Sequence, residues 1–176
     1  MHESADVVVI GGGPGGSTTA ALLAKQGLHV VVIEKERFPR YHIGESLVPG
    51  LHPIFAELDV ADEIANAGFC RKYGVTLLWG RNRELWSVDF ADTGRPGAYE
   101  YIYQVKRAEF DNILMRQARR FGAYVIEDAN VADLIFECDR RVGVRYTVSG
   151  SDEVAEIGAR MVVDASGQSP PARPAV

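Results

Sequence analysis

Asp6-Val-Val-Val-Ile-Gly-Gly-Gly-Pro-Gly-Gly16 is the stretch that decides the fold of this chain. Residues 7–10 are uniformly apolar, as expected of a parallel strand covered on both faces. A Gly-x-Gly-x-x-Gly turn follows, and residues 14–26 predict a helix rich in Ala and Leu. A second apolar strand at residues 30–33 then ends at Glu34. This order predicts an α/β dinucleotide-binding unit.

Each part of this pattern has a physical task in nucleotide binding. The first glycine permits a tight turn, the second lets the backbone approach a pyrophosphate, and the third lets the helix pack closely on the strand. Unpaired N–H groups at the helix start face the phosphates. The acid accepts hydrogen bonds from a ribose diol and repels the 2′-phosphate of NADP. We therefore expect cofactor contacts from Gly11, Gly13, Pro14, Gly15, Gly16 and Glu34.

Composition limits the class of protein. The 176 residues are 47% hydrophobic and 24% charged, as in soluble globular domains. A net charge of −5 argues against a nucleic-acid partner. Neither a signal peptide nor a membrane-length apolar run is recognisable. Cys70 and Cys138 form no CxxC pair and the histidines form no metal pattern, so we expect a cytoplasmic protein without a bound metal.

The rest of the chain predicts further strands and helices, followed by a Pro-rich tail at residues 169–176. We expect helices at 51–58, 62–67 and 108–121, and strands at 75–79, 85–90, 99–105, 123–126, 131–138, 142–149, 154–159 and 161–164. The late β-meander is typical of FAD domains rather than plain NAD domains. We therefore expect a Rossmann-like FAD-binding domain of the hydroxylase/glutathione-reductase type, with an inserted β-meander, over residues 1–168.

Over residues 5–168 the chain resembles the flavin-dependent halogenases, a tryptophan-halogenase-like family. It is most similar to members that act on phenols or on aromatic groups tethered to a carrier protein. Residues 38–50, Phe-Pro-Arg-Tyr-His-Ile-Gly-Glu-Ser-Leu-Val-Pro-Gly, carry the most specific similarity. The others are Gly-Phe-Cys-Arg-Lys-Tyr-Gly at 68–74, Gln-Val-Lys-Arg-Ala-Glu-Phe-Asp at 104–111 and Asp-Ala-Ser-Gly-Gln at 164–168.

The resemblance assigns further site residues. Lys72 matches the family's active-site lysine, and residues 70–105 match part of the substrate region. The remaining expected cofactor contacts are Lys35, Arg40, Glu45, Ser46, Arg107 and Val131. Simpler interpretations stay open. Lys72 could be a solvated lysine, residues 45–46 could be ordinary turn residues, and Arg40 and Arg107 could be surface charges.

The resemblance implies a reaction. Reduced FAD, supplied by a separate flavin reductase, reacts with O2 to a flavin hydroperoxide. Halide attack then yields hypohalous acid, which halogenates an electron-rich aromatic substrate. The family's Trp-x-Trp-x-Ile-Pro signature and most of its substrate cavity would lie beyond Val176. We therefore expect a truncated, inactive portion of the enzyme, ending in the 169–176 tail. Alternatives are an FAD-dependent aromatic hydroxylase or monooxygenase, an inactive nucleotide-binding remnant and a plain NAD module.

Overall fold

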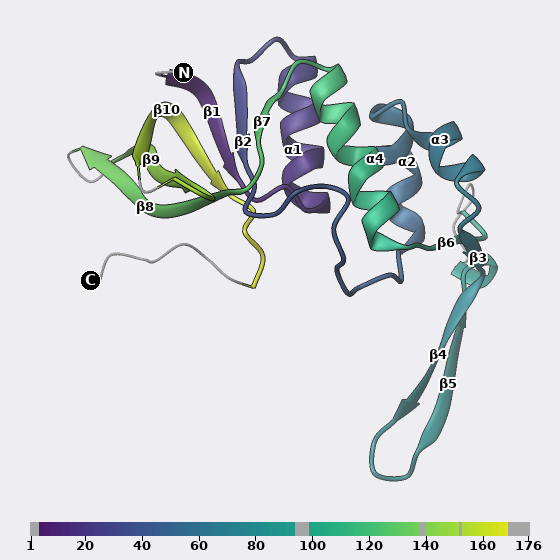
Figure 1. Cartoon of the computed structure of the whole chain (residues 1–176). Helices are drawn as coiled ribbons and strands as arrows, with labels where there is room; N and C mark the ends of the chain where they lie inside the picture. The colour runs from purple at the N-terminus through teal and green to yellow at the C-terminus, as the bar shows by residue number, and fades with distance from the viewer. Residues whose placement is uncertain (1–3, 94–98, 138–139, 152, 169–176) are drawn as a thin grey trace. The chain divides into compact units, whose positions relative to one another are not determined.

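The structure is a computed structural model that describes residues 4–93, 99–137, 140–151 and 153–168 (Figure 1). The chain divides into two compact units, Met1–Tyr41 with Asp111–Val176, and His42–Phe110. The expected tail at 169–176 and Cys138 lie outside the described residues. The expected single domain over 1–168 stays a prediction, and the expected substrate region at 70–105 belongs to the second unit.

The first unit contains a six-stranded sheet in the order β7-β2-β1-β10-β9-β8. Its elements are β1 Ser4–Ile10, α1 Pro14–Lys25, β2 Val30–Ile33, β7 Tyr124–Ile126, β8 Ala129–Glu137, β9 Arg140–Val148 and β10 Val154–Asp164. β1 pairs in parallel with β2 and β10, and β2 pairs in parallel with β7. Strands β1 and β2, which the sequence predicts at residues 7–10 and 30–33, are buried along almost their whole length. The predicted Rossmann-like fold is confirmed.

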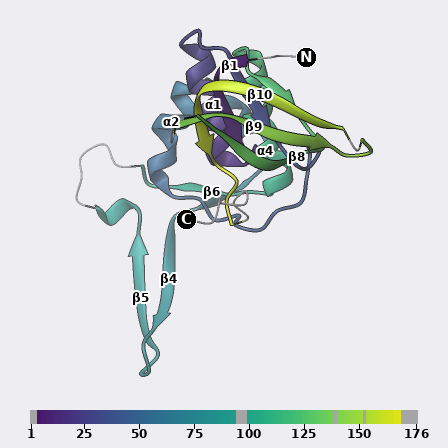
Figure 2. The same cartoon turned by 90° about the vertical axis from the view of Figure 1, so that its left-hand side faces the viewer.

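Strand β10 differs from the sequence expectation, which divides it into separate strands at 154–159 and 161–164. Residues 154–158 pair antiparallel with β9, and from Gly158 onward the same strand pairs in parallel with β1 (Figure 2). The partner of Gly158 on β9 is also a glycine, Gly143. A Cβ at Gly143 would collide with the Ile157 carbonyl of β10. The meander therefore continues the parallel sheet without a break, because small residues allow the changeover within one strand.

One apolar core holds this sheet together. Its members come from both the parallel strands and the meander: Ala5, Val8, Ile10, Val31, Ile33, Ala129, Val131, Leu134, Val144 and Ile157. Helix α1 and the part of α4 (Arg107–Arg120) from Asp111 onward lie on one face of the parallel strands (Figures 1 and 2). Small residues such as Gly16, Ala20 and Ala24 line the buried side of α1, which permits close packing on β1 and β2.

The second unit is built from short elements. These are η1 Pro49–Leu51, α2 His52–Glu57, α3 Ala61–Asn66, β3 Cys70–Lys72, β4 Gly74–Trp79, β5 Glu84–Asp89, η2 Ala91–Thr93, β6 Ile102–Gln104 and the first turn of α4. The expected helices form with slightly shifted ends, whereas the strand expected at 99–105 shortens to β6. Sequence analysis missed β3, which pairs antiparallel with β6.

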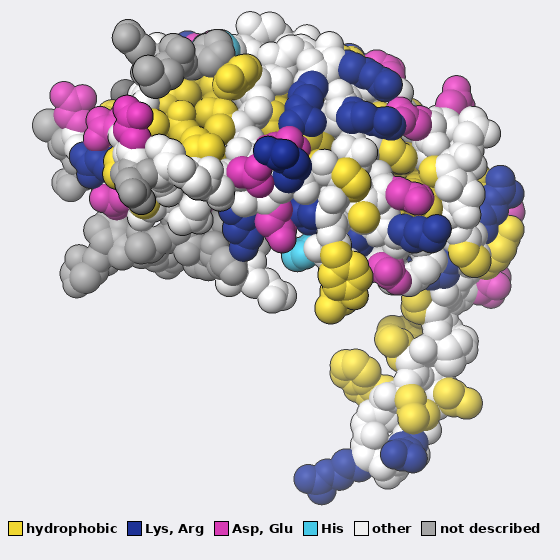
Figure 3. Space-filling model, viewed as in Figure 1, with side chains coloured by type: hydrophobic (Ala, Val, Ile, Leu, Met, Phe, Trp, Pro, Cys, Tyr) yellow, Lys and Arg dark blue, Asp and Glu magenta, His cyan; other side chains and the backbone are white. Residues whose placement is uncertain are grey.

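The β4–β5 hairpin carries exposed apolar side chains on both faces. Leu77 pairs with Trp86, and Leu78 pairs with Leu85. Neighbouring pairs along an antiparallel ribbon point to opposite faces, so each face has its own apolar pair. All four side chains are exposed, and Figure 3 shows hydrophobic atoms along the hairpin. Within the residues described, no helix combines the length and apolarity needed to cross a membrane.

Candidate functional site

The glycine turn between β1 and α1 has the backbone geometry that the sequence predicts. Gly11 adopts a φ of +93°, in the left-handed region that favours glycine. A Cβ on Gly11 would also lie 2.6 Å from the Ala165 carbonyl oxygen. Gly16 faces the Gly11 carbonyl so closely that any side chain would collide with it. The first and third glycines therefore perform their expected structural tasks, the turn and the helix contact.

The start of α1 is open to a ligand. Gly13 is the N-cap residue, and no side chain caps the helix. Pro14 follows, and the first turn contains no acidic residue. Gly15 is exposed, with no atom within 4 Å of the place a Cβ would take. Unpaired N–H groups at such a helix end attract anions, so the backbone here forms a cradle suited to a phosphate group.

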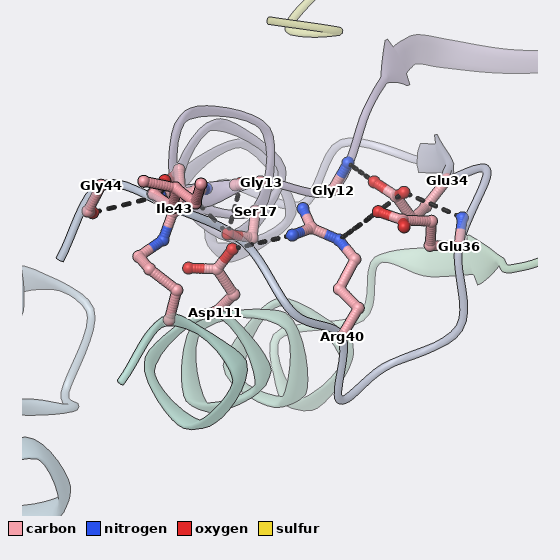
Figure 4. A network of polar contacts seen from close by, with 11 residues as sticks. Gly12, Gly13, Ser17, Glu34, Glu36, Arg40, Ile43, Gly44 and Asp111 are labelled. Atoms are coloured by element: carbon pink, nitrogen blue, oxygen red, sulfur yellow. Dashed lines mark hydrogen bonds and ion pairs between the residues drawn. The ribbon is translucent and has the colours of Figure 1, made fainter. Parts of the chain in front are cut away.

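Glu34 lies buried at the end of β2, beside this turn (Figure 4). One carboxylate oxygen accepts a hydrogen bond from the Gly12 N–H at 2.5 Å, and the other accepts one from the Glu36 N–H at 3.0 Å. Each carboxylate oxygen has a second lone pair, so further donors can bind. The structure therefore fixes the direction of the carboxylate beside the glycine turn, as a ribose-binding acid requires.

The Arg40 side chain lies between the carboxylates of Glu34, Glu36 and Asp111 (Figure 4). Only 8% of its side chain is exposed, and a terminal guanidinium nitrogen lies 3.2 Å from an Asp111 carboxylate oxygen, which is fully buried. Its Nε lies 3.8 Å from Glu34 and 3.4 Å from Glu36 without a hydrogen bond in the structure. A guanidinium nitrogen also lies 3.6 Å from where a Cβ on Gly13 would be. Arg40 therefore belongs to the polar network around the glycine turn.

Sequence reasoning missed Asp111, the buried acid of this network. A signal existed, because Asp111 stands three residues before Leu114 and seven before Ala118, on the apolar side of the expected helix. A carboxylate there is costly unless a cation pairs with it. The helix pattern alone thus indicates a buried partner but does not identify Arg40.

In the second unit, residues 45–47 line up beside β6. Ser46 forms an antiparallel bridge with Gln104, the Leu47 N–H donates to the Tyr103 carbonyl at 3.3 Å, and the Val105 N–H donates to the Glu45 carbonyl at 2.9 Å. Strand β3 pairs with the other side of β6. Strand β6 therefore separates Ser46 from β3, on which Lys72 is the last residue.

The Lys72 side chain reaches across β6. Its Nζ donates to Ser46 Oγ at 2.6 Å and to the Leu47 carbonyl oxygen at 2.5 Å. The same nitrogen lies 5.4 Å from the centre of the Phe90 ring. Partial burial lowers the pKa of the Lys72 amine, because desolvation disfavours its charged form. Lys72 is thus not the freely solvated lysine of the simpler interpretation. We call Ser46, Leu47 and Lys72 the lysine cluster.

Arg107 is buried at the start of α4 and is not a surface charge. One guanidinium nitrogen donates to the Ile43 carbonyl at 2.8 Å and to the Gly44 carbonyl at 3.2 Å. Gly44 has a φ of +103°, and a Cβ there would lie 3.1 Å from that nitrogen. Arg107 therefore fastens the segment that leads directly into residues 45–47.

The other predicted residues have weaker support from their surroundings. Glu45 is exposed and its carboxylate lies 3.4 Å from the Gln104 amide nitrogen. Lys35 is exposed. The Val131 side chain packs into the apolar core. Their contacts with a cofactor stay predictions. Among the parts of the chain that the structure describes, no three His, Cys, Asp or Glu side chains gather as a metal site.

Comparisons with known proteins define the class. A family model described as tryptophan halogenase matches residues 6–100. The tryptophan 2-halogenase of Chondromyces crocatus is 40% identical over 166 residues, which cover 94% of this chain and 31% of that protein. The 1H-pyrrole-2-carbonyl-[peptidyl-carrier protein] chlorinase of Pseudomonas fluorescens is 38% identical over 179 residues, which cover 93% of this chain and 39% of that protein.

A solved structure agrees with these relatives. The myxobacterial chondrochloren halogenase CndH, described as a variant of FAD-dependent halogenases, is 46% identical with a TM-score of 0.85. The match covers 94% of this chain and 38% of that one. The chain therefore belongs to the tryptophan halogenase family of flavin-dependent oxidoreductases, and the predicted resemblance is confirmed. It spans between 31% and 39% of the length of the curated relatives named above.

Proposed function

We propose that this chain forms the FAD-binding portion of a flavin-dependent halogenase acting on an electron-rich aromatic substrate, free or tethered to a carrier protein. The observation that carries the proposal is the uncapped helix start beside the buried, fixed carboxylate of Glu34. That arrangement suits a pyrophosphate followed by a ribose. Family membership supports the halogenase assignment.

The residues present fit FAD. Backbone N–H groups from Gly13 to Gly15 would hold the pyrophosphate, and the free lone pairs of Glu34 would accept the adenosine ribose hydroxyls. Arg40 adds positive charge beside the same turn. When bound and reduced by a separate reductase, FAD would react with O2 and so supply the oxidant that converts halide to hypohalous acid. A chain of this kind works in the cytoplasm, where reduced flavin is available.

Lys72 is the residue that would act on the hypohalous acid. A charged amine donates a hydrogen bond and so holds the acid near a substrate ring, whereas a neutral amine presents a lone pair to the halogen. The lowered pKa of Lys72 enlarges its neutral fraction at a given pH. Arginine cannot take this second role because its guanidinium remains charged.

The first test of this function is cofactor binding by the 176-residue chain. Isothermal titration should show that FAD binds and that Glu34→Ala weakens binding by about 10- to 100-fold for each ribose bond lost. Glu153→Ala, an exposed acid on a different part of the first unit, is the matched control. Equal FAD affinity in Glu34→Ala and the parent contradicts the ribose assignment.

The second test is product formation by the longest polypeptide that the gene encodes. We expect halogenated phenol only when FAD, a flavin reductase, O2 and chloride or bromide are all supplied, and Lys72→Ala and Lys72→Arg should both abolish it. Mass spectrometry identifies the product. A hydroxylated product formed without halide assigns the chain to the hydroxylases instead. The 176-residue chain alone should give neither product.

A further inference from the structure

Ser46, which the sequence analysis predicts as a flavin contact, is hydrogen-bonded to Lys72 in the structure. Its hydroxyl oxygen accepts a hydrogen bond from Lys72 Nζ at 2.6 Å, across β6. The next residue contributes a second acceptor, because the Leu47 carbonyl oxygen lies 2.5 Å from the same nitrogen. Two neighbouring residues therefore hold the only polar atom of the Lys72 side chain.

Two acceptors are enough to orient an amine. An ammonium has three donors, so two fixed bonds leave one N–H pointing in a defined direction. A neutral amine has two donors and one lone pair, so the same two bonds leave the lone pair in that direction. In either protonation state the third position on the nitrogen has the same direction. A lone long lysine side chain would otherwise sample many rotamers.

The acceptors are themselves held firmly. Backbone hydrogen bonds join Leu47 to Tyr103 and Glu45 to Val105. Arg107 binds the carbonyls of Ile43 and Gly44, immediately before this segment. The Leu47 carbonyl is therefore part of the backbone framework, and Ser46 Oγ extends from the same framework on a short side chain.

We propose that Ser46 Oγ and the Leu47 carbonyl oxygen hold the Lys72 amine in one orientation, which makes Ser46 a positioning residue for that amine rather than a flavin contact. The proposal rests on the proposed function in one respect, the assignment of Lys72 as the group that meets the hypohalous acid. The anchor itself is a property of this chain and is measurable without turnover.

The chain offers a clean spectroscopic test, because its lysines are Lys25, Lys35, Lys72 and Lys106. Lysine labelled with ¹³C at the ε carbon gives one signal per residue, and Lys72→Arg identifies the Lys72 signal by its loss. Lys25, Lys35 and Lys106 are exposed and serve as internal references. We expect Lys72 to titrate below the ordinary range of a lysine amine, since burial lowers the pKa of its amine.

The variants then isolate Ser46. Ser46→Ala removes an acceptor that favours the charged amine, so the Lys72 titration should move to still lower pH. Ser46→Thr keeps a hydroxyl and should restore the parent titration. Ser87→Ala removes the hydroxyl that pairs with Thr76 on the β4–β5 hairpin and should leave Lys72 unchanged. Circular dichroism reports whether each variant is folded. A Lys72 signal that is the same in Ser46→Ala and the parent overturns the anchor.

Cofactor binding and turnover separate this proposal from the function on which it rests. With the longest encoded polypeptide, Ser46→Ala should lower the halogenation rate about tenfold at an unchanged FAD dissociation constant, whereas Ser46→Thr recovers most of it. If Ser46→Ala instead binds FAD more weakly but halogenates at the normal rate per bound flavin, Ser46 is a flavin contact and the proposal is overturned. Full halogenation by Lys72→Ala refutes the role of Lys72, while the NMR titration still decides whether the anchor exists.

Discussion

The glycine turn of the first unit and the lysine cluster of the second unit hold polar groups by opposite means. Around the turn, a buried cation, Arg40, meets the carboxylates of Asp111, Glu34 and Glu36. In the second unit, Lys72 and Arg107 donate to one hydroxyl and to main-chain carbonyls. Full charges face each other around the turn, whereas these hydrogen bonds in the second unit run from cations to neutral acceptors.

This difference has an energetic consequence. Removing one member of a buried ion pair leaves the other charge desolvated and unpaired, which is the costliest outcome. Carbonyl groups that lose a donor cost less, because they are dipoles and can take up water. Neutral acceptors also leave an amine whose pKa falls on burial, as at Lys72. The first arrangement favours rigidity, and the second favours an amine that can lose its proton.

The largest expected effect is that of Arg40→Ala. The change removes the guanidinium that lies 3.2 Å from the fully buried Asp111 carboxylate, so the free energy of unfolding should fall by about 3–5 kcal/mol. Urea unfolding followed by circular dichroism measures it. Arg145→Ala is the control, since Arg145 pairs with Glu156 at an exposed site and its loss should be barely detectable. Similar effects for the two arginines would show that the Arg40 network is solvated.

Two adjacent glycines sharpen the contrast within the turn. Gly16→Ala places a methyl group against the Gly11 carbonyl and should destabilise the fold by about 3 kcal/mol. Gly15→Ala meets no atom within 4 Å and should change stability by less than about 1 kcal/mol, in the stabilising direction. The same Gly15→Ala should nevertheless weaken FAD binding if the pyrophosphate lies there. Normal FAD affinity in that variant would move the phosphate site elsewhere.

Arg107→Ala should cost less than Arg40→Ala. It removes charge-assisted bonds to the Ile43 and Gly44 carbonyls, so we expect a loss of about 1.5–3 kcal/mol in the free energy of unfolding. The Lys72 NMR signal should also broaden or shift, because the segment before Ser46 loses its fastening. A loss as large as that for Arg40→Ala would contradict the expected ranking of the two arginines.

The smallest expected effect concerns Asp6, a half-buried residue that contrasts with these buried sites. The His29 N–H, and then Arg160, lower the pKa of Asp6 below its ordinary value of 3.8. Its folded pKa lies below the unfolded one, so its stabilising effect is present above the unfolded pKa and disappears as pH falls through the folded pKa. Asp6→Asn should therefore destabilise slightly at neutral pH and match the parent in strong acid. Parallel stability curves over this pH range would refute the assignment.

Local sequence predicted the nucleotide end of the first unit well. The turn at Gly11, the helix contact at Gly16 and the acid at Glu34 all follow from neighbours within one strand–turn–helix–strand passage. Such spacing specifies geometry because each residue acts on adjacent backbone. The sequence analysis divides β10 wrongly, because Arg160 interrupts the apolar pattern although the strand continues through the change of partners at Gly158.

By itself the sequence determined the fold class, the family and the residue types that could carry the chemistry. Only the tertiary structure decided the partners of those residues. Ser46 and Lys72 lie 26 positions apart and meet because β6 stands between them, while Arg40 and Asp111 lie 71 positions apart. Contacts at such separations depend on strand pairing and burial, which no local spacing records. The sequence thus named the reactive amine, and the fold decided how that amine is held.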